Sequence, residues 1–463
     1  MSVKPSLPKG TRDLLPEAMQ KREYILSVLK EVFRKYGFLP IETPAMENLS
    51  TLTGKYGEEG DRLIFKILNS GDFIKKSDKA AFEQENANAF GQSVSEKALR
   101  YDLTVPFARF VVQNQNELHF PFKRFQIQPV WRADRPQKGR FREFYQCDAD
   151  AVGSDSLLLE LEFIRMYDEV FKTLGVDAAI HMNNRKLLGG LAAALGITER
   201  LGEFTIILDK LDKIGEEGVR KELDKNGFDS KVGDGLFEII GATGSNEERL
   251  EVVSKLVSST EVGAKGVEEA KFLLENLKQL NLKNEVVLDI SLARGLDYYT
   301  GAIFEVKAKN VEMGSIGGGG RYDDLTGIFG MKNLSGIGIS FGLDRIQIVM
   351  EELNLFTDEQ AASTEVMFVN FGEKESLFSL TLANDLRDLG VKAEVYPDNA
   401  KMKKQLDFAN KKNIPNVVMI GSQEMEAGKF SMKNMLSGEQ KEYSRIELLE
   451  HFSTQKGNQY GRH

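Results

Sequence analysis

Residues 123–142 form the stretch whose side chains are best suited to binding phosphate. It contains seven basic residues against a single acidic one, Asp134. The basic residues are Lys123, Arg124, Arg132, Arg135, Lys138, Arg140 and Arg142. Guanidinium groups can donate paired hydrogen bonds to phosphate oxygens, so this stretch could hold a polyphosphate. A charge run is otherwise typical of a solvated hairpin, and the residues that follow favour the ligand-binding interpretation.

The segment after this stretch alternates in a way that suits the floor of a ligand site. In a strand, side chains two positions apart share a face. One face would carry Arg142, Phe144, Gln146, Asp148 and Asp150, and the other Phe141, Tyr145, Cys147 and Ala149. The first row is a poor core, but its Phe144 offers a stacking face. Gln146 and Asp150 lie about 13 Å apart along a strand, so we expect them to hold different ends of a cationic substrate.

Two further segments place arginines and tyrosines beside glycines. In SLARGLDYYTGAIFE (291–305), Arg294, Tyr298 and Tyr299 come before a strand. In isolation, this pattern fits a loop with a buried tyrosine pair equally well. In GIGISFGLDRI, Arg345 falls in the first turn of a helix, where an arginine is usually solvated.

The remaining motifs are weaker when taken one at a time. In LRYDLT, Asp102 and Thr104 would lie on the same side of an extended segment and could hold an α-ammonium group, although such a pair is also typical of a turn. IGGGGRYDD (316–324) lacks the Lys-Ser/Thr of a phosphate-binding P-loop. We expect a glycine-rich turn over 317–320, and the spacing leaves open whether a ligand or a neighbouring strand approaches it.

The spacing of apolar residues predicts the helices and strands that must position these side chains. A helix begins near Pro16 and ends at Gly37, and an extended edge segment follows. Residues 74–97 show no period and are expected to form a mobile surface loop. Strands flank the basic turn, and further strands are expected at 286–290 and 302–308.

Two later parts of the chain have patterns of their own. Residues 184–280 have apolar positions at helical spacing, which predicts a mostly helical insertion. Beyond a polar linker at 355–364, strands and helices alternate, which predicts a small α/β domain with a largely parallel sheet. A lysine cluster in that domain fits a solvated helix face or an RNA contact. Its members are Lys401, Lys403, Lys404, Lys411 and Lys412.

Composition sets limits on the function. The 463 residues are enough for roughly three domains. There is one cysteine and there are four histidines, which argues against a disulfide framework or a multi-cysteine metal site and favours a reducing, cytoplasmic location. Without an apolar run of about 18 residues or a secretory leader, we expect no membrane association. The net charge of −9 means that any nucleic-acid contact must use a local basic patch.

Taken together, the motifs resemble a known family. In chain order, the helix with its proline-bearing strand, the basic strand–loop–strand and the GLDR helix are similar to motifs 1, 2 and 3 of class II aminoacyl-tRNA synthetases. RGLDYYTG and GGGGRYD match the two signature segments of the histidyl-tRNA synthetase family, and LRYDLT and REFYQCDAD fit it. The resemblance covers nearly the whole chain.

The resemblance implies an α+β fold. Its parts would be a class II antiparallel sheet flanked by helices, a helical insertion and a C-terminal α/β anticodon-binding domain. The implied boundaries are a catalytic domain at 1–183 and 281–354, the insertion at 184–280, the linker at 355–364 and the anticodon-binding domain at 365–463.

The resemblance also implies residue roles. The histidine-binding residues would be Asp102, Thr104, Arg132, Gln146, Asp150, Arg294, Tyr298, Tyr299 and Tyr322. The ATP-binding residues would be Arg132, Asp134, Arg140, Phe144 and Arg345. Arg132 and Arg294 would be catalytic at the α-phosphate, and no side chains dedicated to a metal are expected.

The implied activity is ATP-dependent ligation of L-histidine to tRNA(His) through a histidyl-adenylate, releasing AMP and diphosphate, with ATP as substrate and Mg²⁺ required. The implied assembly is a homodimer formed through the Pro44 segment. Two alternatives are a non-catalytic paralogue that regulates the first enzyme of histidine biosynthesis and a plain RNA-binding or scaffold protein. The presence of Arg132 and Arg294 disfavours both alternatives.

Overall fold

The computed structural model describes residues 4–293, 299–357 and 364–460. The chain divides into two compact units. The larger comprises residues 1–12 and 25–355, and the smaller comprises residues 13–24 and 356–463. Each unit is described by itself below.

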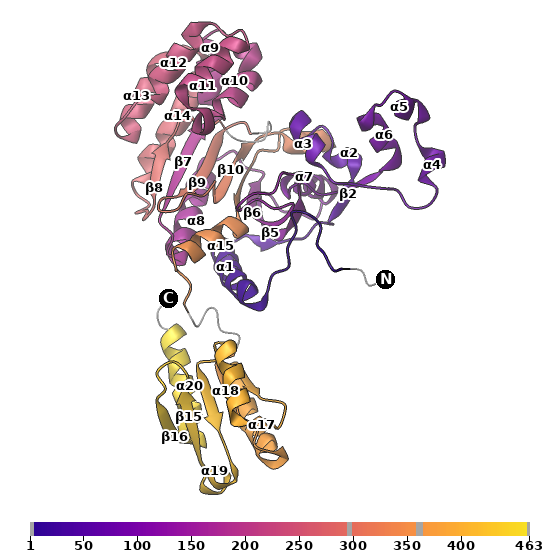
Figure 1. The fold of residues 1–463 in the computed structure, drawn as a ribbon. Helices are drawn as coiled ribbons and strands as arrows, with labels where there is room; N and C mark the ends of the chain where they lie inside the picture. Colours follow the sequence, from indigo (N-terminus) through magenta and orange to yellow (C-terminus); the bar gives the residue numbers. More distant parts are fainter. Residues whose placement is uncertain (1–3, 294–298, 358–363, 461–463) are drawn as a thin grey trace. The chain divides into compact units, whose positions relative to one another are not determined.

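A mixed sheet with the strand order β1-β5-β6-β11-β10-β9-β7-β8 forms the centre of the larger unit (Figure 1). Only the outermost pairs, β1 with β5 and β7 with β8, are parallel. The expected antiparallel class II sheet is therefore confirmed. The strands are β1 (Leu39–Pro40), β5 (Phe122–Trp131), β6 (Glu143–Val152), β7 (Ala178–Asn184), β8 (Glu285–Leu288), β9 (Ala302–Ala308), β10 (Gly317–Tyr322) and β11 (Gly336–Phe341).

The sheet has one apolar face, which helices cover. Helices α1 (Pro16–Lys35) and α8 (Leu158–Leu174) bring Phe33 and Tyr167 against Phe341 of β11, with ring centroids 5.8 and 4.9 Å apart. Helix α15 (Leu343–Glu352) follows β11 directly. Burial of this face stabilises the unit through the hydrophobic effect, and it leaves the opposite face available for polar side chains.

The glycine run at 317–320 is a strand in the middle of the sheet, so the expected turn is wrong. In register, Gly319 lies opposite Phe304 on β9 and Ile339 on β11. A Cβ atom on Gly319 would lie 2.2 Å from the carbonyl oxygen of Gly338. The glycines are needed because the neighbouring backbone approaches closely, which a strand interior tolerates only without side chains.

Residues 74–97 contain short helices, so the prediction of a mobile loop is wrong. The helices are α4 (Phe73–Lys76), α5 (Lys79–Glu83) and α6 (Ala87–Val94). Each begins at a residue whose side chain accepts a hydrogen bond from the first turn, namely Asp72, Asp78 and Asn86. Helices of four to eight residues are too short to show a period, so pattern analysis missed them.

These helices adjoin a second, smaller sheet, and elements beside that sheet contribute to the cavity described below. Its strand order is β2-β4-β3. Its elements and the nearby helices are β2 (Met46–Asn48), α2 (Leu49–Leu52), α3 (Gly57–Leu63), β3 (Lys66–Ile67), β4 (Lys97–Leu99), α7 (Thr104–Gln113) and η2 (Leu325–Phe329). Phe107 of α7 packs against Phe122 and Tyr322 on the polar side of the central sheet.

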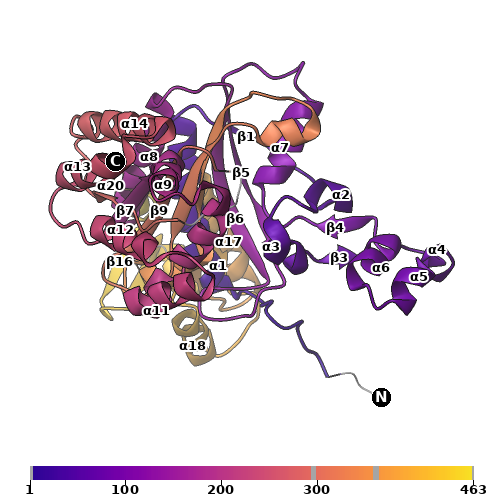
Figure 2. The ribbon, with the colours of Figure 1, turned by 90° about the horizontal axis from the view of Figure 1, so that it is seen from above.

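The stretch between β7 and β8 is helical, as expected from its spacing. It lies at the opposite end of the central sheet from α4–α6 (Figure 2). Its helices are α9 (Arg185–Ala194), η1 (Thr198–Arg200), α10 (Leu201–Leu208), α11 (Leu211–Lys225), α12 (Ser230–Ile240), α13 (Asn246–Val257) and α14 (Glu261–Leu277).

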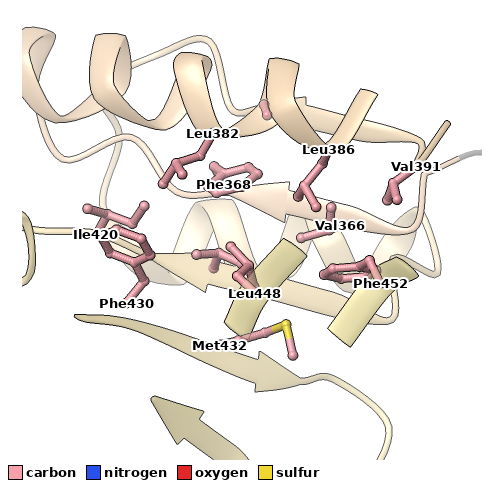
Figure 3. Close-up of a cluster of buried hydrophobic side chains, with 12 residues drawn as sticks. Val366, Phe368, Leu382, Leu386, Val391, Ile420, Phe430, Met432, Leu448 and Phe452 are labelled. Carbon is pink, nitrogen blue, oxygen red and sulfur yellow. The ribbon is translucent and has the colours of Figure 1, made fainter. Parts of the chain in front are cut away.

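The smaller unit contains a five-stranded sheet with the order β13-β12-β14-β15-β16. The first three strands are parallel, and β15 and β16 form an antiparallel hairpin that the sequence analysis did not predict. Its elements are β12 (Val366–Phe368), α17 (Glu373–Asp388), β13 (Ala393–Val395), α18 (Met402–Lys411), β14 (Asn416–Met419), α19 (Ser422–Ala427), β15 (Lys429–Asn434), β16 (Gln440–Ser444) and α20 (Arg445–Tyr460). Figure 3 shows its core, in which Phe368, Leu382 and Leu448 are fully buried. Within the described ranges, none of the helices has the length and apolarity needed to span a membrane.

Candidate active site

A cavity of about 220 Å³ opens on the polar face of the central sheet. Segments far apart in the sequence contribute its walls: the start of α7, the connection between β5 and β6, strand β6, and the strands β9, β10 and β11 with residues just before β9 and β10. The predicted site residues in these walls are Asp102, Thr104, Arg132, Gln146, Asp150, Tyr299 and Tyr322.

Asp102 is held rigidly in the wall of the cavity. Its Oδ1 accepts hydrogen bonds from the Tyr56 hydroxyl at 2.8 Å and from the backbone N–H of Val105 at 3.2 Å. Its Oδ2 has no hydrogen-bond partner, and burial raises the pKa of the Asp102 carboxyl. Thr104 begins helix α7, so the expected extended segment is wrong. The helix start still brings both side chains to the same cavity.

Asp150 lies at the centre of a buried polar cluster. The Tyr322 hydroxyl donates to its Oδ1 at 2.7 Å. Arg124 places Nη2 2.7 Å from its Oδ2, an ion pair whose atoms are not aligned for a hydrogen bond. The Arg124 guanidinium is fully buried and lies 4.2 Å from the ring centroid of Phe107. Burial raises the pKa of the Asp150 carboxyl, and Arg124 opposes that rise.

Arg132 and Gln146 present polar groups near the open end of β5 and β6. The Arg132 Nε donates to the carbonyl of Tyr101 at 3.0 Å, and its guanidinium lies 4.3 Å from the Tyr101 ring and 5.2 Å from the Phe144 ring. These contacts fix the stem of the guanidinium at the cavity wall. The Oε1 of Gln146 is buried and has no partner, so it can accept from a ligand.

Of the residues predicted to bind ATP, Arg132 lines the cavity, and Asp134, Arg140, Phe144 and Arg345 do not. Arg345 donates to the carbonyls of Ser315 at 2.7 Å and Gly139 at 3.2 Å. Arg140 lies 3.7 Å from Asp134. Ser315 itself is in the cavity wall, so Arg345 lies one residue away from the cavity. Arg294 and Tyr298 fall outside the described residues.

The sequence analysis did not assign several residues that line the cavity. They are Asp148, Phe304, Glu305, Ser315, Gly318, Gly319, Gly338, Ile339 and Ser340. Period two places Asp148 on the polar face of β6, but the sequence analysis gave this residue no binding role. The glycines contribute through strand pairing and Ser315 through its place just before β10, and sequence spacing indicates neither.

Among residues 4–293, 299–357 and 364–460, no group of three or more histidine, cysteine or acidic side chains is placed to hold a metal ion. The arrangement of the cavity is that of an anionic pocket with arginines at its rim. Such a pocket can bind a cationic group at its floor and phosphate at its edge.

A family model described as histidyl-tRNA synthetase matches residues 10–74 and 77–346. The chain belongs to the histidyl-tRNA synthetase family. A second model, described as an anticodon binding domain, matches residues 365–455. The smaller unit therefore contains the expected anticodon-binding domain of this family.

Individual relatives agree with this histidyl-tRNA synthetase assignment. The chain is 57% identical to the histidine–tRNA ligase of Christiangramia forsetii, over 95% of this chain and 97% of that protein. It is 54% identical to the histidine–tRNA ligase of Phocaeicola vulgatus, over 97% and 99%. Among solved structures, histidyl-tRNA synthetase from Nostoc sp. PCC 7120 matches with a TM-score of 0.83 at 30% identity, covering 98% of this chain and 100% of that one.

Proposed function

We propose that this chain ligates L-histidine to tRNA(His) with ATP, through a histidyl-adenylate, releasing AMP and diphosphate. The observation that carries the proposal is the convergence of predicted residues from separate segments on one cavity. Family membership and relatives matched over nearly their whole length support it.

The amino-acid end of the cavity suits histidine. Asp102, Thr104 and Gln146 would receive the α-ammonium group, since Asp102 Oδ2 and Gln146 Oε1 are buried acceptors without partners. Asp150 and Tyr322, with Tyr298 and Tyr299, would hold the imidazole. A site built from buried polar groups rejects ligands that leave those groups unpaired.

Activation requires the histidine carboxylate to attack the α-phosphate in line while diphosphate leaves. This chemistry needs positioning and positive charge more than a general base. Arg132 and Arg294 would neutralise charge at the α-phosphate, and Arg140 and Arg345 would hold the outer phosphates. Phe144 would stack on the adenine, beside Asp134.

Mg²⁺ fits this site as a companion of ATP. Mg²⁺ commonly binds through substrate phosphates and water, with one or two carboxylates at most. Bound in that way, it would add charge neutralisation at the triphosphate.

The other parts of the proposal concern the tRNA and the assembly. We assign the catalytic domain to 1–183 and 281–354 and the linker to 355–364. The helical insertion, 184–280, would hold the acceptor arm, and residues 365–463 would bind the anticodon. The active form would be a cytoplasmic homodimer formed through the Pro44 segment, and sedimentation of the purified chain at micromolar concentration should show twice the chain mass.

The test is aminoacylation with purified tRNA(His) and radiolabelled histidine. We expect charging of tRNA(His) and none of a tRNA for another amino acid. We also expect Arg132→Ala to lower charging by at least about 100-fold. A solved structure titled as an ATP phosphoribosyltransferase regulatory subunit/histidyl-tRNA synthetase from Bacillus halodurans shares the fold at 21% identity and a TM-score of 0.72. Absence of all charging would favour a regulatory role instead.

A further inference from the structure

Strand β6 presents three polar side chains to the cavity, and the proposed function uses only two of them. Asp148 lies between Gln146 and Asp150, about 7 Å from each along the strand. Its side chain is 2% exposed and lines the same cavity. A buried carboxylate in the wall of the site is therefore without a role.

The neighbours of Asp148 leave one of its oxygens unused. Ser340, its cross-strand neighbour on β11, makes a side-chain hydrogen bond to the carboxylate, but Oδ1 has no hydrogen-bond partner. Gln126 lies opposite Asp148 on β5. Its amide nitrogen donates instead to Thr43 at 2.8 Å and to Gln128 at 2.6 Å. A buried acceptor without a donor is costly, so Oδ1 has capacity for a donor on a ligand.

The cavity also has fewer nearby cations than buried carboxylates, and Arg124, the cation that acts on Asp148, is paired with Asp150. Asp102, Asp148 and Asp150 are all buried. Arg124 makes its ion pair with Asp150, and Arg132 is the cation that lowers the pKa of Asp102 against the effect of burial. Within the part of the chain that the structure describes, no basic side chain makes an ion pair with Asp148.

We propose that Asp148 is a specificity-determining residue whose free carboxylate oxygen accepts a hydrogen bond from a positively charged N–H group of the bound amino acid. The inference rests on the proposed function, because it adds a contact to the same cavity. A cationic ligand group supplies both the missing donor and the missing charge. An analogue that lacks this charged N–H group leaves the carboxylate oxygen without a donor and without the ligand's positive charge, so it binds less tightly.

The ionisation of Asp148 gives the contact a pH dependence. Burial raises the pKa of Asp148 to about 7; Arg124 on β5 opposes this rise, and Asp150 and Asp102 add to it. Tyr167 on α8 has a pKa raised well above its ordinary value and stays neutral in this range. The carboxylate is therefore ionised and able to bind a cation above about pH 7, and it loses that ability as the pH falls below 7.

The test measures KM and kcat for histidine in ATP–pyrophosphate exchange, with the full-length wild type and Asp148→Asn. At pH 8, we expect Asp148→Asn to raise KM about tenfold or more, the loss of a charged hydrogen bond, and to change kcat by less than about threefold. The ratio of the two KM values should fall toward one between pH 8 and pH 6. Titration of a histidine group that does not contact Asp148 affects both proteins equally and cancels in this ratio.

Cys147→Ala provides the matched control, because Cys147 is the adjacent buried residue on the other face of β6. It should leave KM within about twofold, and thermal melting should show that both variants are folded. Inhibition by imidazole lactate, which keeps the ring but lacks the ammonium group, identifies the contact. If Asp148→Asn weakens the binding of histidine more than that of imidazole lactate, the contact is to the ammonium group. If it weakens the binding of both equally, the contact is to the imidazole.

The outcomes separate the two proposals. If the wild type exchanges with histidine and Asp148→Asn has an unchanged KM at pH 8, the inference about Asp148 is overturned while the proposed function stands. A KM ratio that does not vary with pH would also overturn it. If the wild type neither exchanges with histidine nor binds it in calorimetry, the proposed function fails and the inference fails with it.

Discussion

At the scale of single residues, Asp150 joins two other buried side chains of the site, Arg124 and Tyr322. Its removal would leave the fully buried Arg124 without its ion-pair partner and the Tyr322 hydroxyl without its acceptor. We predict that Asp150→Ala lowers histidine-dependent exchange about 10- to 100-fold, the range expected for loss of a charged hydrogen bond. Steady-state exchange kinetics measure this.

Controls distinguish this effect from loss of folding. Asp150→Asn keeps the shape of the side chain and removes its charge, and it should show a similar loss of exchange. Glu162→Gln breaks a half-exposed ion pair with Lys123 and should leave exchange within about twofold. Wild-type activity in Asp150→Ala would refute the role given to this carboxylate.

Asp148 makes a separate prediction about stability without ligand. Its folded-state pKa, raised to about 7 by burial, lies above its ordinary value of 3.8. A raised carboxyl pKa means that ionisation opposes folding, so stability is lost as the pH rises from about 4 to 7. Asp148→Asn should therefore be more stable than the wild type at pH 8, by on the order of 4 kcal/mol, and this gain should shrink toward pH 4. Urea unfolding at the two pH values checks it, and an equal difference at both would contradict it.

Period two was enough to predict the functional face of β6, because Gln146, Asp148 and Asp150 alternate along one strand. The Tyr56 hydroxyl bound to Asp102 could not be predicted in the same way. Tyr56 is 46 positions away in the chain, and only tertiary packing brings the two together. Local spacing finds residues on one element and misses partners supplied by another.

At the scale of elements, the glycines of the central sheet determine how closely strands and side chains approach. Gly338 of β11 lies opposite Asp150 of β6. A Cβ atom there would lie 2.0 Å from Asp150 Oδ1. We predict that Gly338→Ala displaces the carboxylate, lowers exchange at least about tenfold and costs about 1–3 kcal/mol of stability.

Gly202→Ala is the matched control for this substitution. Gly202 lies in helix α10, and a Cβ there would meet nothing within 4 Å. Alanine should therefore leave exchange unchanged and add up to about 1 kcal/mol, because glycine weakens a helix interior. If Gly338→Ala behaved like Gly202→Ala in both assays, the close approach would have no consequence.

The elements that could be predicted were the long ones. The 20-residue helix α1 and the ten-residue strands β5 and β6 carry enough alternation to reveal their type. The glycine strand β10 was missed because glycines have no side chain to show a period, and because spacing does not reveal its pairing with β9 and β11. Helices α4–α6 depend on single capping residues, which spacing alone does not distinguish from turns.

At the scale of the whole molecule, an acidic chain must bind an acidic nucleic acid. With a net charge of −9, binding requires local basic surfaces. Lys403 and Lys404 are exposed on α18 of the anticodon-binding domain. We predict that the double substitution K403E/K404E raises KM for tRNA about 3- to 10-fold and leaves exchange within about twofold.

The control for this double substitution is K75E/K76E, which makes the same charge change at two exposed lysines of α4. Aminoacylation at two salt concentrations should show a weaker salt dependence only for the α18 variant. An equal effect of the two variants would indicate that net charge, rather than the α18 surface, governs tRNA binding.

The most direct test of the central claim is ATP–pyrophosphate exchange in the absence of tRNA, with each of the twenty amino acids in turn. The cavity of buried carboxylates, hydroxyls and arginines predicts exchange with histidine alone. Exchange with a different amino acid would contradict the assignment of the pocket. Exchange with none would mean that the family's fold and cavity are present without the activation chemistry.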